Sequence, residues 1–499
     1  MLRNFAAASA LAALLSACGG STDPVGLSSV SMDSSAAPPP YGAAAAIDPI
    51  AGEDTAATAT QSCSSLAPLP TVPATARSIA SFGVAPSETK DNTAAIQAAL
   101  DALKPGDWLV FPAGKYLQSK SLRVRVPGVV LWGDGATLVA TNPTDTSILL
   151  QADGIGLYKF RLHAVTTTRG STPQQSRIAI FPAGTSRVRN VIVRRNIIEN
   201  GGAPGTSLAN GSSATGIMVY HADGFLVAEN YVKRTLADGI HVTGGSINGR
   251  VVRNLVRENG DDMISVVSYM GSAGTPISTL LANLTTLRAE KLARNIVITG
   301  NDVDGQYWGR GIAVVGGENV TIEDNKITNA TYGAGVLLAH ESSYVTFGVH
   351  DVIVRNNTIR HVQTTAPAYS VGTAATAPRT GHAGIELHSL ASSEELADPT
   401  FARVVAVETV RVENNAVDDT LADGIRVGVG SGKAGLIGLL NNPLSSIGKT
   451  ALNIRNSPTP AYNTYCSGNK DDGNATSNNL CMGANPPVTG ATLDCAKAL

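Results

Sequence analysis

The sequence is short of several kinds of residue, and each shortage excludes a class of protein. Lys and Arg (37) nearly balance Asp and Glu (39), and no basic cluster is present, so we expect no nucleic-acid partner. Aromatic residues make up only 5% of the chain. Helical periodicity is lacking, which argues against a long α-solenoid. Beyond the N-terminus, no run approaches the roughly 20 apolar residues that a spanning helix needs.

Cysteine is also scarce. There are five in 499 residues, and none shows the CxxC spacing typical of a metal site. Cys18 lies in an N-terminal leader. The other four are an even number, which favours disulfides in an oxidising compartment. The sequence does not choose among the three possible pairings, but at least one bridge is expected to hold the C-terminal tail; the four are Cys63, Cys466, Cys481 and Cys495.

The first 18 residues have the pattern of a secretory signal. A basic Arg3 precedes an apolar run from Phe5 to Leu15 and a small-residue cleavage site. The segment Leu15-Ser-Ala-Cys18 resembles a bacterial lipobox, and the resemblance implies cleavage before Cys18 and acylation of its thiol, for example with palmitate. The alternative is an ordinary secretory signal cut elsewhere. We therefore expect a cell-envelope protein, anchored by lipid at the outer membrane of a Gram-negative bacterium, or a secreted one.

Composition divides the rest of the chain. Residues 19–77 are rich in Ala, Ser, Pro and Thr, so we expect a disordered linker. Residues 78–455 form the expected folded domain. Residues 456–499 have Asn, Gly and Pro throughout, which predicts an irregular tail tied by disulfides. We expect the protein to be a monomer.

The folded part is built on a short repeat. A phrase of the form Gly-Ile-x-Val recurs, and two successive intervals, Gly216 to Gly239 and Gly239 to Met263, are 23 and 24 residues. The phrase starts at Gly216, Gly239, Gly311, Gly335, Gly384 and Gly424. A second phrase has Asn followed two residues later by an apolar residue, as at Asn196, Asn230, Asn301, Asn325, Asn357 and Asn415. Such a ladder of Asn predicts a structural role at a repeated turn.

Each repeat contains short alternating runs separated by Gly, Asn and Asp, which is the chemistry of strands and turns. One unit of this length cannot bury its own apolar face, whereas a stack of units buries a continuous core. The 51 glycines and the many Val and Ile residues agree with this arrangement. We predict an all-β fold, a right-handed parallel β-helix. A leucine-rich repeat is the rival, but its Leu and Asn spacing is absent.

The start of the domain predicts a capping helix. Residues 89–103 form an amphipathic segment in which Ile96, Ala99, Leu100 and Leu103 share a face. Together with Ser81-Phe-Gly-Val and Phe111-Pro-Ala-Gly-Lys-Tyr, it resembles the N-terminal cap of pectin-lyase-like β-helix proteins. The resemblance covers roughly residues 78–455 and implies that this helix plugs the open end of the coil. Three stretches break the period and are expected to be loops that wall one face: 271–293, 363–381 and 389–404.

Acidic residues gather where the repeat is placed in register. If the insertions are looped out, the residues before each Gly-Ile form one column: Thr215, Asp238, Asp262, Arg310, Ala334, Ala383 and Asp423. Adjacent rungs of a sheet lie ~4.8 Å apart. Two carboxylates and a guanidinium would therefore stand side by side, with Asp261 beside them. Repulsion between the carboxylates should raise the pKa of at least one, and acid/base cleavage of a glycoside needs one protonated and one ionised carboxyl.

The pattern is similar to that of polygalacturonase-type hydrolases, whose motifs are Asn-Thr-Asp, Asp-Asp, Gly-His-Gly and Arg-Ile-Lys on successive coils. Leu236-Ala-Asp238 matches the first only in its Asp, and Gly260-Asp261-Asp262 matches the second well. The resemblance implies Asp238, Asp261 and Asp262 as catalytic acid and base. Gly309-Arg310-Gly311 has Arg in place of His, and Leu337-Leu-Ala-His340 lacks both basic residues. A polysaccharide other than a galacturonide is therefore expected.

Further side chains near the column are candidates for substrate binding. These are His241, Arg310, Tyr269, Tyr307 and Trp308, whereas His340 and Glu341 are expected on the surface of a loop. Structural roles remain possible for several, since Asp before Gly is ordinary turn chemistry, as at Asp423, and Arg310 would also serve simply to neutralise Asp262.

Three functions fit the pattern. The first is a glycoside hydrolase with no metal or other cofactor. The second is a polysaccharide lyase or uronate C5-epimerase, in which the acids would bind Ca²⁺ or neutralise a uronate carboxyl and Arg310 or His241 would abstract the C5 proton. The third is a non-catalytic envelope lipoprotein that binds polysaccharide. In each case a polysaccharide is the expected partner.

Overall fold

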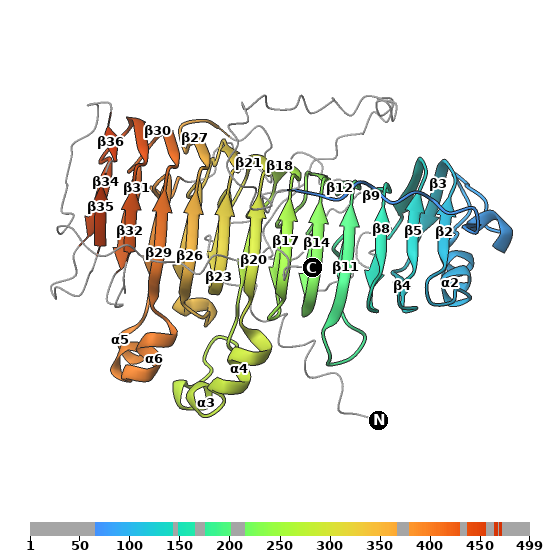
Figure 1. Ribbon diagram of the computed structural model, residues 1–499, viewed down its shortest axis with the longest axis horizontal. Coiled ribbons are helices and arrows are strands. Elements are labelled where there is room, and N and C mark those ends of the chain that lie inside the picture. The colour runs from blue at the N-terminus through green and yellow to red at the C-terminus, as the bar shows by residue number, and fades with distance from the viewer. Residues whose placement is uncertain are drawn as a thin grey trace, which may run out of the picture.

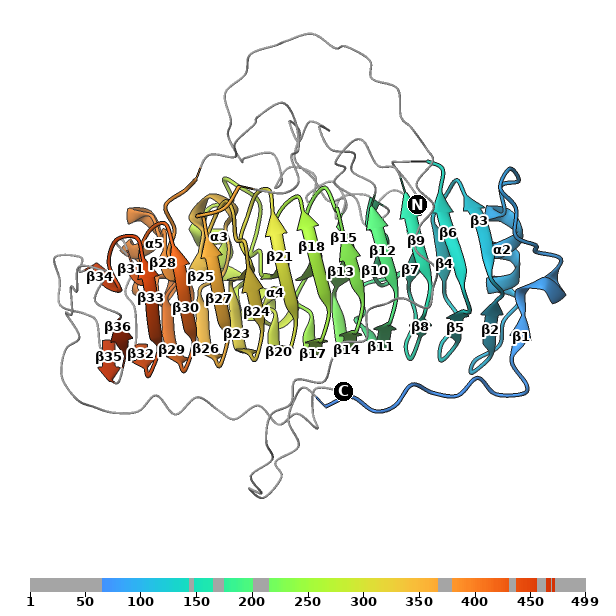
Figure 2. The same ribbon diagram turned by 90° about the horizontal axis from the view of Figure 1, so that it is seen from above.

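The chain winds into a coil in which every turn contributes one strand to each of three parallel sheets (Figures 1 and 2). The computed structural model describes residues 65–142, 148–164, 175–200, 215–366, 379–429, 437–455, 464–467 and 469–471. All ladders between named strands are parallel, and the strand order within each sheet follows the coil from one end to the other. The predicted right-handed parallel β-helix is confirmed.

We name the three sheets A, B and C. Sheet A contains β1 (Arg77–Ser78), β2 (Trp108–Phe111), β5 (Val130–Gly133), β8 (Gly156–Tyr158), β11 (Val188–Arg194), β14 (Ala222–Ala228), β17 (Ile247–Val252), β20 (Arg294–Thr299), β23 (Gly317–Glu323), β26 (Val349–Arg355), β29 (Val407–Glu413), β32 (Ile437–Leu440) and β35 (Thr464–Ser467). Sheet B contains β3 (Gly114–Gln118), β6 (Ala136–Ala140), β9 (Arg161–Ala164), β12 (Ile197–Asn200), β15 (Tyr231–Lys233), β18 (Leu255–Asn259), β21 (Asp302–Gln306), β24 (Lys326–Thr328), β27 (Thr358–Val362), β30 (Ala416–Thr420), β33 (Pro443–Ile447) and β36 (Lys470–Asp471). Sheet C contains β4 (Leu122–Val124), β7 (Ile148–Leu150), β10 (Ile178–Ile180), β13 (Ile217–Tyr220), β16 (Ile240–Thr243), β19 (Ile264–Val267), β22 (Ile312–Val315), β25 (Val336–His340), β28 (Ile385–Ser389), β31 (Ile425–Val429) and β34 (Leu452–Arg455).

The interior of the coil is a continuous column of buried Val, Ile and Leu side chains from all three sheets. At the turn from sheet A to sheet B, asparagines stack in a ladder, in which each side-chain amide donates to the amide oxygen of the next rung. The ladder runs through Asn196, Asn230, Asn254, Asn301, Asn325, Asn357, Asn415, Asn442 and Asn469. Because these buried amides satisfy one another and the turn backbone, the ladder fixes the register of the coil. The predicted structural role of the asparagines is confirmed.

A helix covers the N-terminal end, as predicted. Helix α2 (Thr93–Asp101) begins four residues later than expected, because Asp91 Oδ1 accepts the Thr93 N–H at 2.9 Å and ends the preceding turn. The expected apolar face is buried, namely Ile96, Ala99, Leu100 and Leu103. A short 3-10 helix, η1 (Ile79–Phe82), precedes α2.

Two of the expected loops contain helices. Residues 271–293 carry α3 (Ile277–Ala282) and α4 (Leu284–Lys291), and residues 389–404 carry α5 (Ser393–Ala397) and α6 (Pro399–Val404). A 3-10 helix, η3 (Ser342–Tyr344), lies between β25 and β26. Figure 1 shows α3 to α6 on the same side of the coil. Leu280 of α3 and Phe401 of α6 pack in one small apolar cluster with residues outside the helices, among them Met270 and Phe347.

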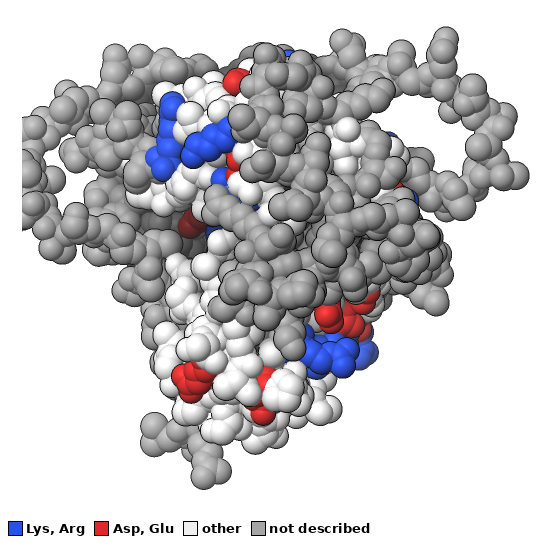
Figure 3. All heavy atoms as spheres, turned by 90° about the vertical axis from the view of Figure 1, so that its left-hand side faces the viewer, with Lys and Arg blue, Asp and Glu red and all other residues white. Residues whose placement is uncertain are grey.

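The tail also differs from expectation. Strands β35 and β36 lie within residues 456–499 and extend sheets A and B by one rung, so the coil does not end at residue 455. The leader, the linker up to residue 64, Cys18, Cys63, Cys481 and Cys495 lie outside the described residues. Of the residues described, no helix is long and apolar enough to cross a membrane. Viewed from the C-terminal end, the visible charged side chains are of both signs (Figure 3).

Candidate active site

The predicted column of charged residues exists at the edge where the chain enters sheet C. Ile240 pairs with Ile264 and Ile264 with Ile312, so the residues two positions earlier lie on adjacent rungs. The Gly239 N–H donates to the carbonyl of Asp262 at 3.0 Å, and the Met263 N–H donates to that of Arg310, also at 3.0 Å. The long excursion between β19 and β20 is looped out, as the register required.

Three carboxylates meet at this edge, and we call Asp238, Asp261 and Asp262 the acid cluster. One oxygen from each lies within 4.8 Å of the others. Asp238 and Asp262 are buried, with 8% and 5% exposure, and Asp261 is half-buried. The close approach depends on Gly309, whose φ is +74°. A Cβ at that position would lie 2.4 Å from Asp261 Oδ1 and 2.5 Å from the Asp262 nitrogen.

Asp262 is the carboxyl most perturbed by its surroundings. Its Oδ1 accepts the Arg310 backbone N–H at 2.6 Å, and Arg310 Nη1 lies 3.6 Å from its Oδ2. Burial raises the pKa of Asp262 well above its ordinary value. The guanidinium of Arg310 acts against this, but the charges of Asp261, Asp238 and Glu341 raise the pKa further. The site therefore favours the protonated form of Asp262.

Arg310 is held between carboxylates. Besides its contact with Asp262, its Nη2 donates to Glu341 Oε1. Burial acts to lower the pKa of Arg310, but the charges of Glu341, Asp262 and Asp261 outweigh it and the pKa lies above the ordinary value. An arginine in this state cannot abstract a proton, so the expectation of Arg310 as the C5 base is wrong. Its charge is also already matched by protein carboxylates.

His241 stands on β16 with its ring fixed from one side. Its Nδ1 bonds to Asp238 Oδ2 and lies 2.7 Å from Ser265 Oγ, which itself donates to Asp238 Oδ2 at 2.7 Å. The Nε2 atom is the ring nitrogen that these contacts leave available. Tyr269 follows β19 and is half-buried. Burial raises the pKa of its phenol well above the ordinary value, and the charges of Asp238 and Glu341 add to the effect. Tyr269 is therefore a neutral hydroxyl beside the acids.

The two aromatic candidates, Tyr307 and Trp308, lie in different surroundings. Tyr307 is 1% exposed, so its ring belongs to the packed interior and the expected contact with substrate is wrong for this residue. Trp308 is half-buried, and its backbone N–H donates to the Gly260 carbonyl at 3.0 Å, next to the acid cluster. The Trp308 ring packs edge-on against Tyr332 with 4.8 Å between centroids. Trp308 and Tyr332 thus border the site.

His340 and Glu341 differ most from expectation, since neither side chain is exposed on the surface. His340 is the last residue of β25 and is fully buried, with its Nε2 3.4 Å from Glu395 Oε1. Glu341 follows it and pairs with Arg310. The pairing of Glu341 with Arg310 was not predicted, because nothing in the local sequence pattern shows that the chain after β25 turns back beside the preceding rung.

The acid cluster offers three of the oxygen ligands that a Ca²⁺ ion would need. Ca²⁺ takes six to eight oxygens. Asp238 Oδ2 and Asp262 Oδ1 already accept protein hydrogen bonds from Ser265 and from the Arg310 backbone. Among the described residues, no other group of His, Cys, Asp or Glu is spaced to hold a metal ion. Backbone carbonyls and waters would have to supply the remaining ligands of a Ca²⁺ ion.

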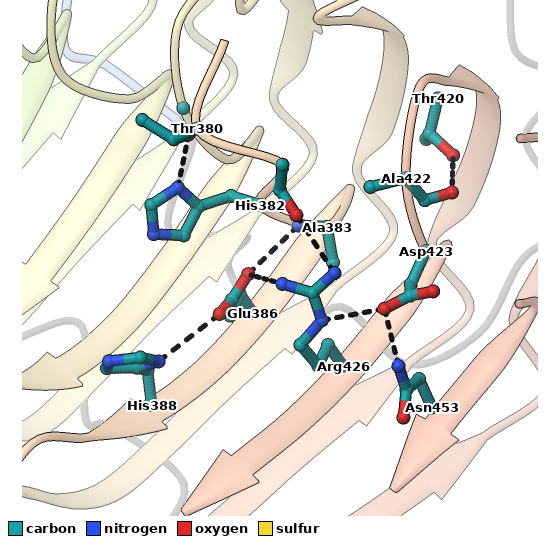
Figure 4. Close-up of polar contacts among 12 residues, drawn as sticks. Thr380, His382, Ala383, Glu386, His388, Thr420, Ala422, Asp423, Arg426 and Asn453 are labelled. Atoms are coloured by element: carbon teal, nitrogen blue, oxygen red, sulfur yellow. Dashed lines mark hydrogen bonds and ion pairs between the residues drawn. The ribbon is translucent and has the colours of Figure 1, made fainter. Parts of the chain in front are cut away.

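A second polar cluster lies further along sheet C, and sequence reasoning did not find it. Glu386 on β28 and Asp423 and Arg426 at β31 are buried and bonded to one another, with His382 and His388 beside them (Figure 4). Asp423 occupies the same column as Asp238 and Asp262, and the phrase Asp423-Gly-Ile-Arg426 has the form of Asp238-Gly-Ile-His241. The signal was therefore the repeated phrase itself, which we interpreted as turn chemistry.

Comparison with known proteins agrees with the fold. Residues 76–267 match the model of a family described as rhamnogalacturonase A/epimerase, pectate lyase-like. A search of curated protein sequences found no match. Similar solved structures include the Agl-KA catalytic domain, with 14% identity over 82% of this chain and 69% of that chain and a TM-score of 0.52.

Two other solved structures have comparable similarity. One is the catalytic domain of a GH87 α-1,3-glucanase in complex with nigerose, with 16% identity over 83% of this chain and 70% of that chain and a TM-score of 0.52. The other is the A-module of a mannuronan C-5 epimerase from Azotobacter vinelandii, with 16% identity over 79% and 98% of the two chains and a TM-score of 0.51. At these identities the likeness concerns the architecture.

Proposed function

Because residues 76–267 match a family described as rhamnogalacturonase A/epimerase, pectate lyase-like, and the chain winds into a parallel β-helix, we propose that it is a polysaccharide-acting enzyme that hydrolyses glycosidic bonds at the acid cluster. One observation carries this proposal. Three carboxyls lie within 4.8 Å of one another on an edge of sheet C, and burial raises the pKa of one of them, Asp262, well above its ordinary value. A protonated and an ionised carboxyl at one bond are what acid/base cleavage of a glycoside requires.

The roles follow from burial and contacts. Asp262 donates its proton to the glycosidic oxygen as the bond to the leaving sugar breaks. Asp261, the more exposed carboxylate, takes a proton from the attacking water, whose oxygen bonds to the anomeric carbon. Arg310 and Glu341 set the pKa of Asp262, and Asp238 orients His241 toward a sugar hydroxyl. Trp308 offers an apolar ring face beside the cleaved bond.

The comparisons support a carbohydrate partner without choosing the sugar. The two neighbours named above are an α-1,3-glucanase and a mannuronan epimerase, so proteins of this architecture act on both neutral and acidic glycans. In this chain Arg310 is already paired with Asp262 and Glu341. A uronate carboxylate at this site would meet the acid cluster and Glu341, while the guanidinium of Arg310 is already engaged by them, and this favours an uncharged substrate.

A uronate epimerase or lyase is the second candidate, and one contact favours it. His241 is held through Nδ1 by Asp238, which leaves Nε2 to take a C5 proton, and burial keeps the Tyr269 phenol protonated, as a proton donor must be. A lyase gives unsaturated products that absorb in the ultraviolet, whereas an epimerase leaves the chain length unchanged. A non-catalytic binder would show saturable glycan binding with no product.

The envelope location remains a proposal that rests on the leader. Acylation of Cys18 and tethering through residues 19–77 would hold the coil at a membrane surface, where polysaccharides are displayed. Radiolabelled palmitate should label the full chain produced in a Gram-negative host, and Cys18→Ala should abolish the labelling. A labelled Cys18→Ala chain would contradict the anchor.

A panel assay tests the function. The full chain is incubated with neutral and acidic polysaccharides, among them α-1,3-glucan and mannuronan, and reducing ends and ultraviolet absorbance are followed in parallel. Hydrolysis predicts reducing ends without absorbance and no loss of activity with a chelator. Absorbance at each new end, or C5 inversion without cleavage, would favour the second candidate. No change in any polysaccharide would overturn both.

A further inference from the structure

The second polar cluster is built around one buried arginine. Arg426 Nε donates to Asp423 Oδ2 at 2.6 Å, its Nη1 donates to Glu386 Oε2 at 3.1 Å, and its Nη2 donates to the Gly381 carbonyl at 2.9 Å (Figure 4). Glu386 and Asp423 are each 1% exposed and Arg426 is 7% exposed. A buried triad of charges is costly unless every group is bonded, and stability alone rarely accounts for one on the outer face of a sheet.

The triad fixes a short segment of chain, residues 380–383, that leads into β28. Arg426 bonds this segment from outside the coil through the Gly381 carbonyl. Gln363, which is fully buried, bonds it from within: the Gly381 N–H donates to Gln363 Oε1 at 2.8 Å, and Gln363 Nε2 donates to the His382 carbonyl at 2.9 Å. A segment that follows a long excursion is thus held from two sides. The consequence is a fixed position for His382.

This arrangement brings two histidine side chains close together. The rings of His382 and His388 have their centroids 6.4 Å apart, with 59° between their planes. His388 Nδ1 lies 3.2 Å from Glu386 Oε1, and His382 Nδ1 lies 2.5 Å from Thr380 Oγ1. Both residues are half-buried. Since each ring is held through Nδ1, the Nε2 atoms are the ones left to meet a ligand, and a ring that donates from Nδ1 accepts at Nε2.

The charges around the two histidines favour an uncharged ligand. Burial lowers the pKa of His382, the Glu386 carboxylate offsets this in part, and Arg310 lowers it further, which favours the neutral ring. Arg426 is shared by Glu386 and Asp423, so its charge is already matched. A carboxylate or phosphate would meet these two carboxylates, whereas a sugar hydroxyl can donate to an imidazole nitrogen without desolvating a charge.

The cluster lies on the path that an extended glycan would take. Strand β28 is three rungs beyond β19, which carries Ser265, so the two sites are about 14 Å apart along the coil. The Thr380 hydroxyl donates to the Tyr332 carbonyl at 2.8 Å, and the Tyr332 ring packs against Trp308, so the segment that carries His382 lies on the side of the cluster that faces the acids. Both sites belong to the outer side of sheet C. Their separation is one that a chain of several sugar units spans.

We propose that His382 and His388 form a second saccharide-binding subsite, which holds uncharged sugar units of the polysaccharide whose bond lies at the acid cluster. Hydroxyl groups of the glycan donate to the two Nε2 atoms. The Glu386, Asp423 and Arg426 triad positions both rings, since it bonds the His388 imidazole and the segment that carries His382. This inference rests on the proposed function, because it needs the same glycan to reach both sites.

Calorimetric titration tests the subsite in the full chain carrying Asp262→Asn, which blocks turnover. The probes are α-1,3-linked gluco-oligosaccharides of two and six units and a hexamer of mannuronate. His388→Ala and His382→Ala should each weaken binding of the neutral hexamer about fivefold or more and leave the dimer unchanged. The control is His350→Ala, because His350 is a half-buried histidine paired with Glu408 on sheet A. It should leave both affinities unchanged.

The outcomes separate the two proposals. If the panel assay shows glycan cleavage but neither histidine variant affects the hexamer, the subsite is wrong and the proposed function stands. Equal losses of affinity for the neutral dimer and hexamer would indicate a general disturbance of the protein and would overturn the subsite. A loss of affinity confined to the mannuronate hexamer would also overturn it. So would the absence of binding of any probe. If the chain cleaves no glycan in the panel, the proposed function fails with it.

Discussion

At the scale of residues, the burial of Asp262 sets the expected dependence on pH. A proton donor works only while protonated, so activity should fall as pH rises through its raised pKa. Glu341→Gln removes a charge that raises this pKa and should move the alkaline limb of kcat/KM to lower pH. Arg310→Gln removes the charge that lowers it and should move the limb to higher pH. Shifts of the same sign, or none, in the pH profiles would contradict the assignment.

Gly309 gives a second prediction at this scale. Gly309→Ala strains a φ of +74° and drives a methyl group against Asp261 and the Asp262 backbone. The matched control is Gly274→Ala, where φ is +80° and a Cβ would meet nothing within 4 Å. Both should lose about 1 kcal/mol of unfolding free energy through the backbone. Only Gly309→Ala should lose activity, about 100-fold, as measured by reducing ends. Equal activity in the two variants would show that this contact does not position the acids.

The sequence predicted the residues that the repeat itself aligns. Asp238, Asp262 and Arg310 come together because backbone pairing fixes their spacing, and counting from Gly-Ile was enough to find them. Glu341 comes from a turn that folds back, and burial of Tyr307 depends on packing around it. Neither the position of Glu341 nor the burial of Tyr307 follows from the repeat period, so neither could be predicted from the sequence.

At the scale of elements, helix α5 contacts the strand end that carries one residue of the site. Ser392 and Glu395 form a capping box at the start of α5, and Glu395 also lies 3.4 Å from the buried His340. His340 immediately precedes Glu341, which pairs with Arg310. The helices were missed because an insertion carries no coil period, and short helices stabilised by packing leave little periodic signal of their own.

The same contacts predict how stability varies with pH. Burial raises the pKa of Glu395, but hydrogen bonds from His340 and Ser392 outweigh it and hold the pKa at about 2. A carboxyl with a depressed folded pKa stabilises the protein above its unfolded pKa, and the contribution is lost as pH falls through about 4.5 toward 2. We expect the contribution to be at most roughly 3 kcal/mol.

Urea unfolding followed by circular dichroism between pH 2 and 7 measures this. Glu395→Gln should show a shallower loss of unfolding free energy below pH 4.5 than the parent chain. Glu394→Gln alters the exposed neighbour on the same helix and should follow the parent curve. Identical curves for Glu395→Gln and the parent would show that the contact with His340 contributes nothing to folding.

At the scale of the whole molecule, the architecture and the activity rest on different parts of the sequence. The Gly-Ile phrases and the Asn ladder determine the coil, and they were enough to predict it. The proposed activity depends on a few outward side chains of sheet C, and one fold can carry unrelated chemistries. The sequence alone therefore predicted a polysaccharide-acting β-helix and left the sugar and the bond open.

The central claim is that the paired carboxyls at the middle of the coil break glycosidic bonds by hydrolysis. Product analysis of Asp261→Asn and Asp262→Asn on the polysaccharide cleaved by the parent chain tests it most directly. The control is Asp223→Asn, a half-buried aspartate on sheet A that accepts a hydrogen bond from Asn248. Release of reducing ends should fall about 1,000-fold in the first two variants and persist in the control, with all three folded. Undiminished release of reducing ends by Asp262→Asn would contradict the account.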